Sequence, residues 1–378
     1  MQTTHPRNDT MKLRSPFFLL LILFVAVACQ DDEDDGQTMT PDPAVFDDTP
    51  YAFDPQGLPA PTGLQDDNVL TNEGVKLGKM LFFEPMLSKN NVQSCGSCHN
   101  QSNGFTDTAR FSIGVDGFEG GRHAMSVFNL AWHTNQFFWD GRSNLLRDQA
   151  LEPIVDPVEM NETLENVVAK LSGSDMYRDQ FIRAFGSEEI TPEKMGLAME
   201  QFMLSIVSGN SKYDRYQMGL EELTESEMRG LELYTTEYNP FFPDDSGADC
   251  EHCHGGPNFE NDQYMNNGMD TDAEITDIGR EAVTGNPADK AKFKVPSLRN
   301  IALTAPYMHD GRFATLEEVI DHYNEGIKTS STVDGALLAT QFEGLQLTEQ
   351  DKEDLISFLH TLTDESLATN PDYENPFE

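Results

Sequence analysis

The sequence predicts a mainly α-helical protein with long irregular connections, built from two related halves. Apolar residues recur at helical spacing in several segments, and no segment shows the sustained alternation of a large sheet. A five-residue motif of two cysteines and a histidine occurs once in each half. The 378 residues are enough for two domains of ordinary size, each with its own core.

Two helices can be placed from their first residues. Thr191 followed by Pro192 is typical of an N-cap and a first helical residue, and apolar residues then recur until Gly209. Thr348 and Asp351 form a capping box that predicts a final helix. The residues expected on the buried faces are Met195, Met199, Phe202 and Ile206 in the first helix and Leu355, Leu359 and Leu362 in the second.

The repeated motif is C-x-x-C-H, in residues 95–99 and again in residues 250–254. Two thiols at this spacing can add to the two vinyl groups of one haem, while the next histidine offers an imidazole to the iron. The expected attachment residues are Cys95, Cys98 and His99 for a first haem c, and Cys250, Cys253 and His254 for a second. The fold class is therefore expected to be two cytochrome c-like haem domains.

The alternatives for these cysteines are a zinc site or redox disulfides. The histidine after each pair argues against both. Of the 5 cysteines in the chain, only Cys29 lies outside the two motifs. We therefore favour two covalently bound haem c groups.

A second related segment follows each haem motif. The pattern S-x-x-N, followed later by D-G-R, begins at Ser126 and at Ser297, an offset of 171 residues (297 minus 126). Such a repeat is typical of a duplicated domain. We expect an N-terminal haem domain over residues 61–215 and a C-terminal haem domain over residues 216–378.

The first residues are typical of an export signal. Lys12 and Arg14 precede an apolar run that is shorter than the roughly 20 residues needed to span a bilayer. The run ends at Cys29 in a lipoprotein-like context. We expect a signal peptide over residues 1–29, a lipid anchor on Cys29, an acidic, proline-containing linker over residues 30–60, and a location in the periplasm or outer cell envelope.

The charge of the chain excludes nucleic acid as a partner. Lysine and arginine number 25 against 65 aspartate and glutamate residues, which gives a net charge of −40. Such a chain repels nucleic acid and anionic lipid and attracts basic proteins. The composition leaves open whether the acidic residues form a docking patch or a solvated surface.

Further motifs resemble the bacterial di-haem cytochrome c peroxidase and MauG family. They are residues 138–142 (FWDGR), 149–150 (QA), 157–160 (PVEM), 295–300 (VPSLRN) and 305–311 (APYMHDG). The resemblance covers roughly residues 70–365. It implies that hydrogen peroxide reacts at the N-terminal haem, and that a small cytochrome c or cupredoxin supplies electrons through the C-terminal haem.

The resemblance also implies roles for three side chains near the first haem. Glu159 is the acid–base candidate, because peroxide must lose a proton from one oxygen and gain one on the other before the O–O bond breaks. Gln149 can orient peroxide by hydrogen bonding without a change of charge. Trp139 is the expected aromatic bridge between the haems, and its alternative is core packing.

Two positions differ from the family pattern. The histidine that caps the N-terminal iron in some members lies sixteen residues after His99, where this chain has Val115, which cannot ligate. We therefore expect a first haem that is open to peroxide without reductive activation. A calcium site at the carbonyls of Thr304 and Pro306 is implied, but His123 replaces the family's asparagine and is a poor substitute for an oxygen ligand.

The expected sixth ligand of the second haem is Tyr323. Met308 is the obvious choice from composition, but the family places its axial ligand fifteen residues further on, at Tyr323. A phenolate lowers the potential and favours storage of oxidising equivalents. His322 is a further alternative ligand of the second haem. His133 and His123 are the alternative ligands to consider near the first haem.

The role of Arg299 has two alternatives. Arg299 is expected to pair with a haem propionate or to hold the domain interface.

The leading function is an exported peroxidase. The alternatives are a MauG-like enzyme that oxidises tyrosine or tryptophan in a partner protein, and a two-haem electron carrier. A carrier needs two six-coordinate irons and no distal acid, so Val115, Gln149 and Glu159 favour an enzyme.

Overall fold

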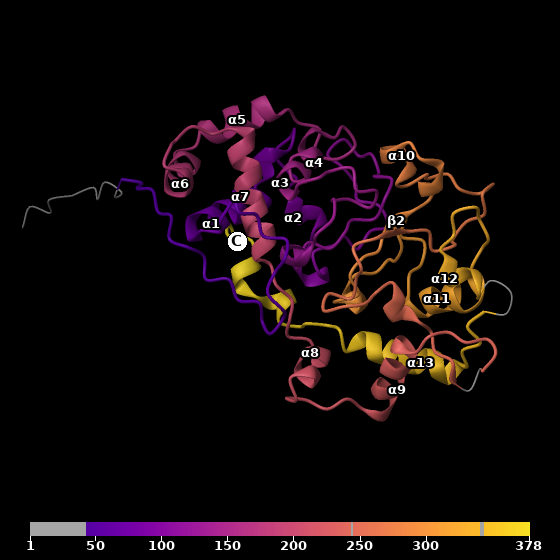
Figure 1. The fold of residues 1–378 in the computed structure, drawn as a ribbon. Helices are drawn as coiled ribbons and strands as arrows, with labels where there is room; N and C mark the ends of the chain where they lie inside the picture. Colours follow the sequence, from indigo (N-terminus) through magenta and orange to yellow (C-terminus); the bar gives the residue numbers. More distant parts are fainter. Residues whose placement is uncertain (1–42, 243–244, 341–343) are drawn as a thin grey trace, which may run out of the picture. The chain divides into compact units, whose positions relative to one another are not determined.

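The protein is largely helical, with one short two-stranded sheet (Figure 1). A computed structural model describes residues 43–242, 245–340 and 344–378. The predicted signal peptide, Cys29 and the first part of the linker lie outside these residues. The mainly α prediction is confirmed.

The helices and strands are short and separated by long connections. The α-helices are α1 (Asn72–Phe82), α2 (Cys95–Cys98), α3 (Leu146–Gln149), α4 (Glu152–Val155), α5 (Leu164–Ser172), α6 (Asp175–Phe185), α7 (Pro192–Ser205), α8 (Lys212–Gln217), α9 (Glu225–Thr235), α10 (Glu281–Thr284), α11 (Leu316–Asp321), α12 (Gly335–Leu338) and α13 (Glu349–His360). The antiparallel strands are β1 (Tyr264–Met265) and β2 (Phe293–Lys294). The 3-10 turns are η1 (Pro85–Leu87), η2 (Gln101–Asn103), η3 (Leu130–Trp132), η5 (Cys250–His252), η6 (Pro287–Asp289), η7 (Ile301–Leu303), η9 (Leu367–Thr369) and η10 (Pro371–Tyr373), and η8 (His322–Gly326) is a π-helix.

Both helix starts read from the sequence are confirmed. The side chain of Thr191 accepts a hydrogen bond from the backbone N–H of Lys194, and Thr348 forms a capping box with Asp351. Helix α7 ends earlier than expected, at Ser205, because the backbone of Ile206 is extended. The predicted apolar faces of both helices are buried.

The described residues form two apolar cores. The first surrounds α1 and α7 and includes Leu77 and Phe202, while the second surrounds α9 and α13. The C-terminal segment returns to the first core, where the Tyr373 hydroxyl accepts from the Val207 N–H at 3.1 Å (Figure 1). The predicted C-terminal domain includes these last residues, although Leu367 and Tyr373 pack on the first core. The domain boundary near residue 215 stays a prediction.

The same glycine-mediated helix crossing occurs in both halves. A Cβ atom on Gly78 of α1 would lie 1.9 Å from the carbonyl oxygen of Ala198 in α7. A Cβ atom on Gly230 of α9 would lie 2.0 Å from the carbonyl oxygen of Asp354 in α13. These distances are far below van der Waals contact, so each helix pair packs backbone against backbone.

The backbone also confirms the internal repeat. Asn129 and Asn300 both have left-handed φ angles, 53° and 57°, and each precedes a 3-10 turn, η3 or η7. Phe138 and Met308 occupy matching positions with φ of 67° and 74°. The left-handed region is uncommon for residues other than glycine and most unusual for bulky ones such as phenylalanine and methionine, so its occurrence at matching positions indicates two copies of one supersecondary unit.

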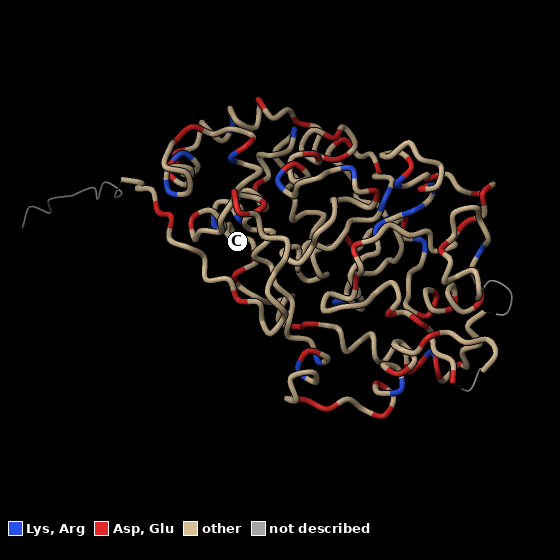
Figure 2. Tube along the Cα trace, viewed as in Figure 1, with Lys and Arg blue, Asp and Glu red and all other residues tan. Residues whose placement is uncertain are grey.

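Acidic residues are distributed along the described part of the trace and are not confined to one element (Figure 2). This distribution favours a solvated acidic surface over a single acidic patch. Among the described residues, no helix combines the length and the apolar character needed to cross a bilayer.

We expect Gly230→Ala to destabilise the second core by about 1–3 kcal/mol, because the added methyl group forces α9 away from α13. Chemical denaturation followed by haem absorbance and circular dichroism measures the effect. Gly335→Ala is the matched control, since a Cβ atom there meets nothing within 4 Å. Equal stabilities of the two variants would contradict the close crossing.

Candidate active site

The first haem motif lies on α2 and on the residue that follows it. Ser94 and Ser97 form a capping box at the start of this single turn. The ring of His99 lies with Nδ1 2.9 Å from the carbonyl oxygen of Phe105. This hydrogen bond holds the proton on Nδ1 and leaves Nε2 free for a metal.

The second haem motif has the same arrangement. The Nδ1 atom of His254 lies 3.0 Å from the carbonyl oxygen of Pro296. Burial lowers the pKa of both His99 and His254, so both rings are neutral, as an iron ligand must be. The two motifs therefore share the donor geometry of a haem-binding histidine.

The cysteines fit haem attachment better than a zinc site. All four are free thiols, and burial raises the pKa of Cys95 and Cys250 to about 12. Cys95 packs against the first core and Cys250 against the second. Among the described residues, the four sulfurs do not form one metal-binding group.

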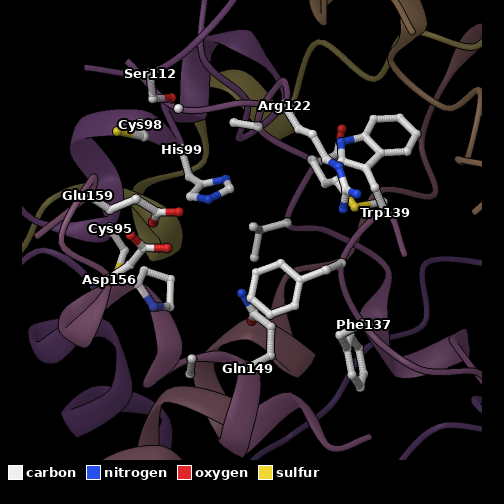
Figure 3. A pocket seen from close by; sticks show the side chains of 18 of the residues that line it. Cys95, Cys98, His99, Ser112, Arg122, Phe137, Trp139, Gln149, Asp156 and Glu159 are labelled. Atoms are coloured by element: carbon white, nitrogen blue, oxygen red, sulfur yellow. The ribbon is translucent and has the colours of Figure 1, made fainter. Parts of the chain in front are cut away.

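One cavity of about 400 Å³ joins the first motif to the side chains predicted around it. Its lining includes Cys95, His99, Trp139, Gln149 and Glu159 (Figure 3). Gln149 ends α3, and Glu159 lies in the loop that follows α4. The fold therefore brings the predicted peroxide-binding residues to the first haem motif.

Backbone contacts position Glu159. The backbone N–H of Val115 donates to the carbonyl oxygen of Glu159 at 2.8 Å. The neighbouring Gly114 allows this close approach, since a Cβ atom there would lie 2.1 Å from the carbonyl oxygen of Val158. Val115 thus contributes a backbone hydrogen bond to the site, and it is not among the residues that line the cavity.

The Glu159 carboxyl is poised to carry a proton. Burial raises its pKa, the negative charge of Asp156 adds to this effect, and Arg142 opposes it. A raised pKa keeps the carboxyl protonated to a higher pH than an exposed glutamate. Asp156 lines the same cavity and was not singled out from the sequence, where a lone aspartate carries no signal.

Trp139 lines both the first cavity and a second, smaller cavity of about 100 Å³. Its indole N–H donates to the carbonyl oxygen of His123 at 2.8 Å, and its own carbonyl accepts from the Lys294 N–H at 2.8 Å. These contacts fix the ring beside both cavities. Thr304 and Pro306 line only the smaller cavity.

The residues at the implied calcium site do not fit a calcium ion. The imidazole of His123 is buried there, with Nδ1 3.2 Å from the carbonyl oxygen of Ala109 and with Nε2 lacking a hydrogen-bond partner among the described residues. Calcium needs six or more oxygen ligands, and this site offers a nitrogen side chain instead. We therefore assign no role to calcium.

Asn267 brings together the candidate ligands of the second haem. Its side chain donates to the sulfur of Met308 at 3.2 Å and hydrogen bonds to Tyr323, while its carbonyl lies 3.0 Å from Nε2 of His322. Tyr323 lies in the π-helix η8, a geometry that recurs at functional sites. Burial raises the pKa of Tyr323, so it is a neutral phenol until a cation binds. The Nε2 atom of His322 already has a partner.

Arg299 lies in a buried ion pair. Its guanidinium donates to both carboxylate oxygens of Asp214, at 2.8 and 2.9 Å, and to the carbonyl of Pro257. Only 2% of the side chain is exposed. This placement favours the interface alternative over a contact with a haem propionate.

Sequence reasoning missed Lys294, which lines both cavities with only 3% of its surface exposed. The available signal was a lysine between the apolar residues Phe293 and Val295. Lysines are almost never fully buried without a partner, but a single sequence does not show burial. His133, considered above as a possible ligand, is the side-chain neighbour of Lys294.

Comparison with known proteins extends these observations. The profile of the family "Di-haem cytochrome c peroxidase" matches residues 72–222. The cytochrome c551 peroxidase of Nitrosomonas europaea is 36% identical over 304 residues, covering 80% of this chain and 82% of its own. The methylamine utilization protein MauG of Methylorubrum extorquens is 35% identical over 316 residues, covering 83% and 84%.

A solved structure gives the same result. It is that of a MauG-like protein associated with microbial copper homeostasis, with a TM-score of 0.78 and 36% identity. The similarity covers 87% of this chain and 99% of the solved one. On this evidence the chain belongs to the di-haem cytochrome c peroxidase and MauG family and is a peroxidase-type oxidoreductase.

Proposed function

We propose that the protein is an exported enzyme that reduces hydrogen peroxide at the N-terminal haem, with electrons that a small redox protein delivers through the C-terminal haem. The observation that carries this proposal is the single cavity shared by His99, Gln149, Glu159 and Trp139. Export, Cys29 lipidation and the identity of the donor are parts of the proposal. The net charge of −40 favours a basic donor.

The reaction needs two electrons and two protons for each peroxide and releases two waters. Haem c, when bound, supplies the iron at which peroxide reacts. Glu159 takes the proton from one peroxide oxygen and returns it to the other. Gln149 orients peroxide through its amide, and Trp139 offers an aromatic path toward the second half.

We expect the first haem to be high-spin in the fully oxidised enzyme, because Val115 offers no side-chain ligand. Electron paramagnetic resonance of the oxidised holoenzyme should show one high-spin ferric centre. Two low-spin centres, with activity only after half-reduction, would show that another residue caps this iron.

Glu159→Gln should leave both haems attached and slow peroxide cleavage by about a factor of 100 or more, because the amide cannot carry the proton. Rapid mixing of the oxidised enzyme with peroxide, followed by absorbance, measures the step. Unchanged formation of the oxidised intermediate would rule out the proton-carrying role.

Asp156→Asn is the control for this prediction. It removes the charge that helps to raise the pKa of Glu159. The acidic limb in the pH dependence of the peroxide cleavage rate should therefore move to lower pH, while cleavage stays fast. Arg142→Gln removes the opposing charge, so the limb should move to higher pH. Shifts in the same direction would mean that a different group titrates.

A MauG-like activity is the second candidate, and the position of Tyr323 favours it. Tyr323 is half-buried against the second core and hydrogen bonds to Asn267, and the thiols of Cys250 and Cys253 are close enough to affect its pKa. An anionic phenolate ligand favours the oxidised metal and therefore the storage of oxidising equivalents. Met308 competes for the same role, since its sulfur also contacts Asn267.

We expect Tyr323→Phe to change the absorption and resonance spectra of the second haem and to raise its potential, because a phenolate ligand is lost. Met308→Leu should leave both properties close to those of the wild type. An unaltered second haem in the Tyr323→Phe enzyme would eliminate this assignment.

A further inference from the structure

Lys294 connects the two haem motifs through its backbone. Its N–H donates to the carbonyl of Trp139, which lines the first cavity. It belongs to β2, where it pairs with Tyr264 of β1. The next residue of β1, Met265, has its sulfur 3.4 Å from the thiol of Cys253. One strand residue therefore lies between the tryptophan of one half and the haem motif of the other.

The ammonium of Lys294 has neutral partners. Nζ contacts Nε2 of His133 and the carbonyl oxygen of Gln136, and it faces the ring of Phe137, whose centroid is 5.9 Å away. No carboxylate of the described residues forms an ion pair with Lys294. A buried cation whose direct contacts are neutral is costly, so the Lys294 ammonium is close to losing its proton.

His133 extends this contact toward the surface. When Nε2 accepts from Lys294, the proton of the ring is on Nδ1, which lies 3.0 Å from Oδ1 of Asp262 and 3.6 Å from Oε1 of Glu260. These are ion-pair distances, and Oδ1 of Asp262 forms no hydrogen bond with a described residue. Asp262 is 19% exposed, whereas His133 is only 6% exposed. Lys294, His133 and Asp262 are thus successive titratable groups, each close to the next, between the space shared by the haem sites and the partly exposed Asp262.

His133, Glu260 and Asp262 are also close enough together to be considered as a metal site. A metal bound to Nδ1 of His133 requires a lone pair on Nδ1. The hydrogen bond from Lys294 to Nε2 instead places the ring proton on Nδ1. The two arrangements exclude each other. The lysine ammonium therefore supplies the positive charge at this place, and no metal is needed.

We propose that Lys294 is a positioning residue that couples proton uptake to electron transfer between the two haem sites. The electron comes from the redox partner, and the proton comes from solvent through Asp262 and His133. An electron that arrives beside Lys294 adds negative charge, which favours the ammonium and takes up one proton. This inference rests on the proposed two-haem function.

The groups around Lys294 agree with a transition near neutral pH. Burial lowers its pKa to about 8, the charges of Asp262 and Glu260 oppose this effect, and Arg280 adds to it. The titratable or charged side chains that face Lys294 are His133, Tyr264, Asp262, Glu260 and Arg280.

The test is a redox titration of both haems in the holoenzyme, followed by visible absorption at several values between about pH 6 and about pH 10. In the wild type, the equilibrium constant for electron uptake should fall about tenfold above pH 8, the order expected from a partly screened unit charge. Lys294→Arg keeps the charge and cannot titrate, so it should remove the fall and keep the low-pH value. Lys294→Met should show the high-pH value throughout.

Two further variants keep the test decisive if Lys294→Met does not fold. Asp262→Asn removes a charge that stabilises the ammonium, so the fall should move to lower pH. Lys292→Met removes the same charge from a lysine that is 30% exposed next to β2, and it should behave as the wild type.

The proposal is overturned if Lys294→Arg keeps the wild-type pH dependence, or if Lys292→Met reproduces the effect of Lys294→Met. Binding of Zn²⁺ by the wild type that is lost in Asp262→Asn would also overturn it, because a metal would then take the place of the ammonium. These titrations use no peroxide. A failure of the proposed peroxidase reaction is therefore distinguishable from a failure of this inference.

Discussion

Each haem motif depends first on a hydrogen bond from Nδ1 of its histidine to a backbone carbonyl. In the first half the acceptor is Phe105, which is fully buried and has a left-handed φ of 58°. Its conformation is held by the short loop in which the Phe105 N–H donates to the carbonyl of Asn100. A strained backbone persists only where packing fixes it, and here the buried phenyl ring supplies that packing. The histidine then has one tautomer and one direction in which to offer Nε2.

The two halves are joined by the asparagines that mark the repeat. Asn129 exchanges hydrogen bonds with the backbone of Ser208, at 2.7 and 2.9 Å, and Asn300 donates to the Ser208 hydroxyl at 2.9 Å. All three residues are completely buried. Buried polar side chains of this kind specify one relative arrangement, because any other leaves donors unpaired. The repeat is therefore also the device that fixes the haem motifs relative to each other.

Features that depend on neighbouring residues could be predicted from the sequence, and features that depend on distant contacts could not. The caps at Thr191 and Thr348 are local, and the cavity around Gln149 and Glu159 follows from short motifs with a known order. The early end of α7, the return of the C-terminal segment and the partner of Arg299 depend on contacts between residues far apart in the chain. Lys294 was missed for the same reason, since its burial depends on segments from both halves.

Among the described residues, the buried arginine and the buried lysine show how different partners give different chemistry. Arg299 forms a bidentate pair with Asp214, in which the carboxylate compensates a guanidinium that never loses its proton. That pair is suited to hold α8 against the second half under all conditions. Lys294 has an imidazole and a carbonyl in place of a carboxylate, and an ammonium loses its proton readily when buried. The arginine is placed where a constant charge supports the fold, and the lysine is placed beside Trp139, where a variable charge can respond to an electron.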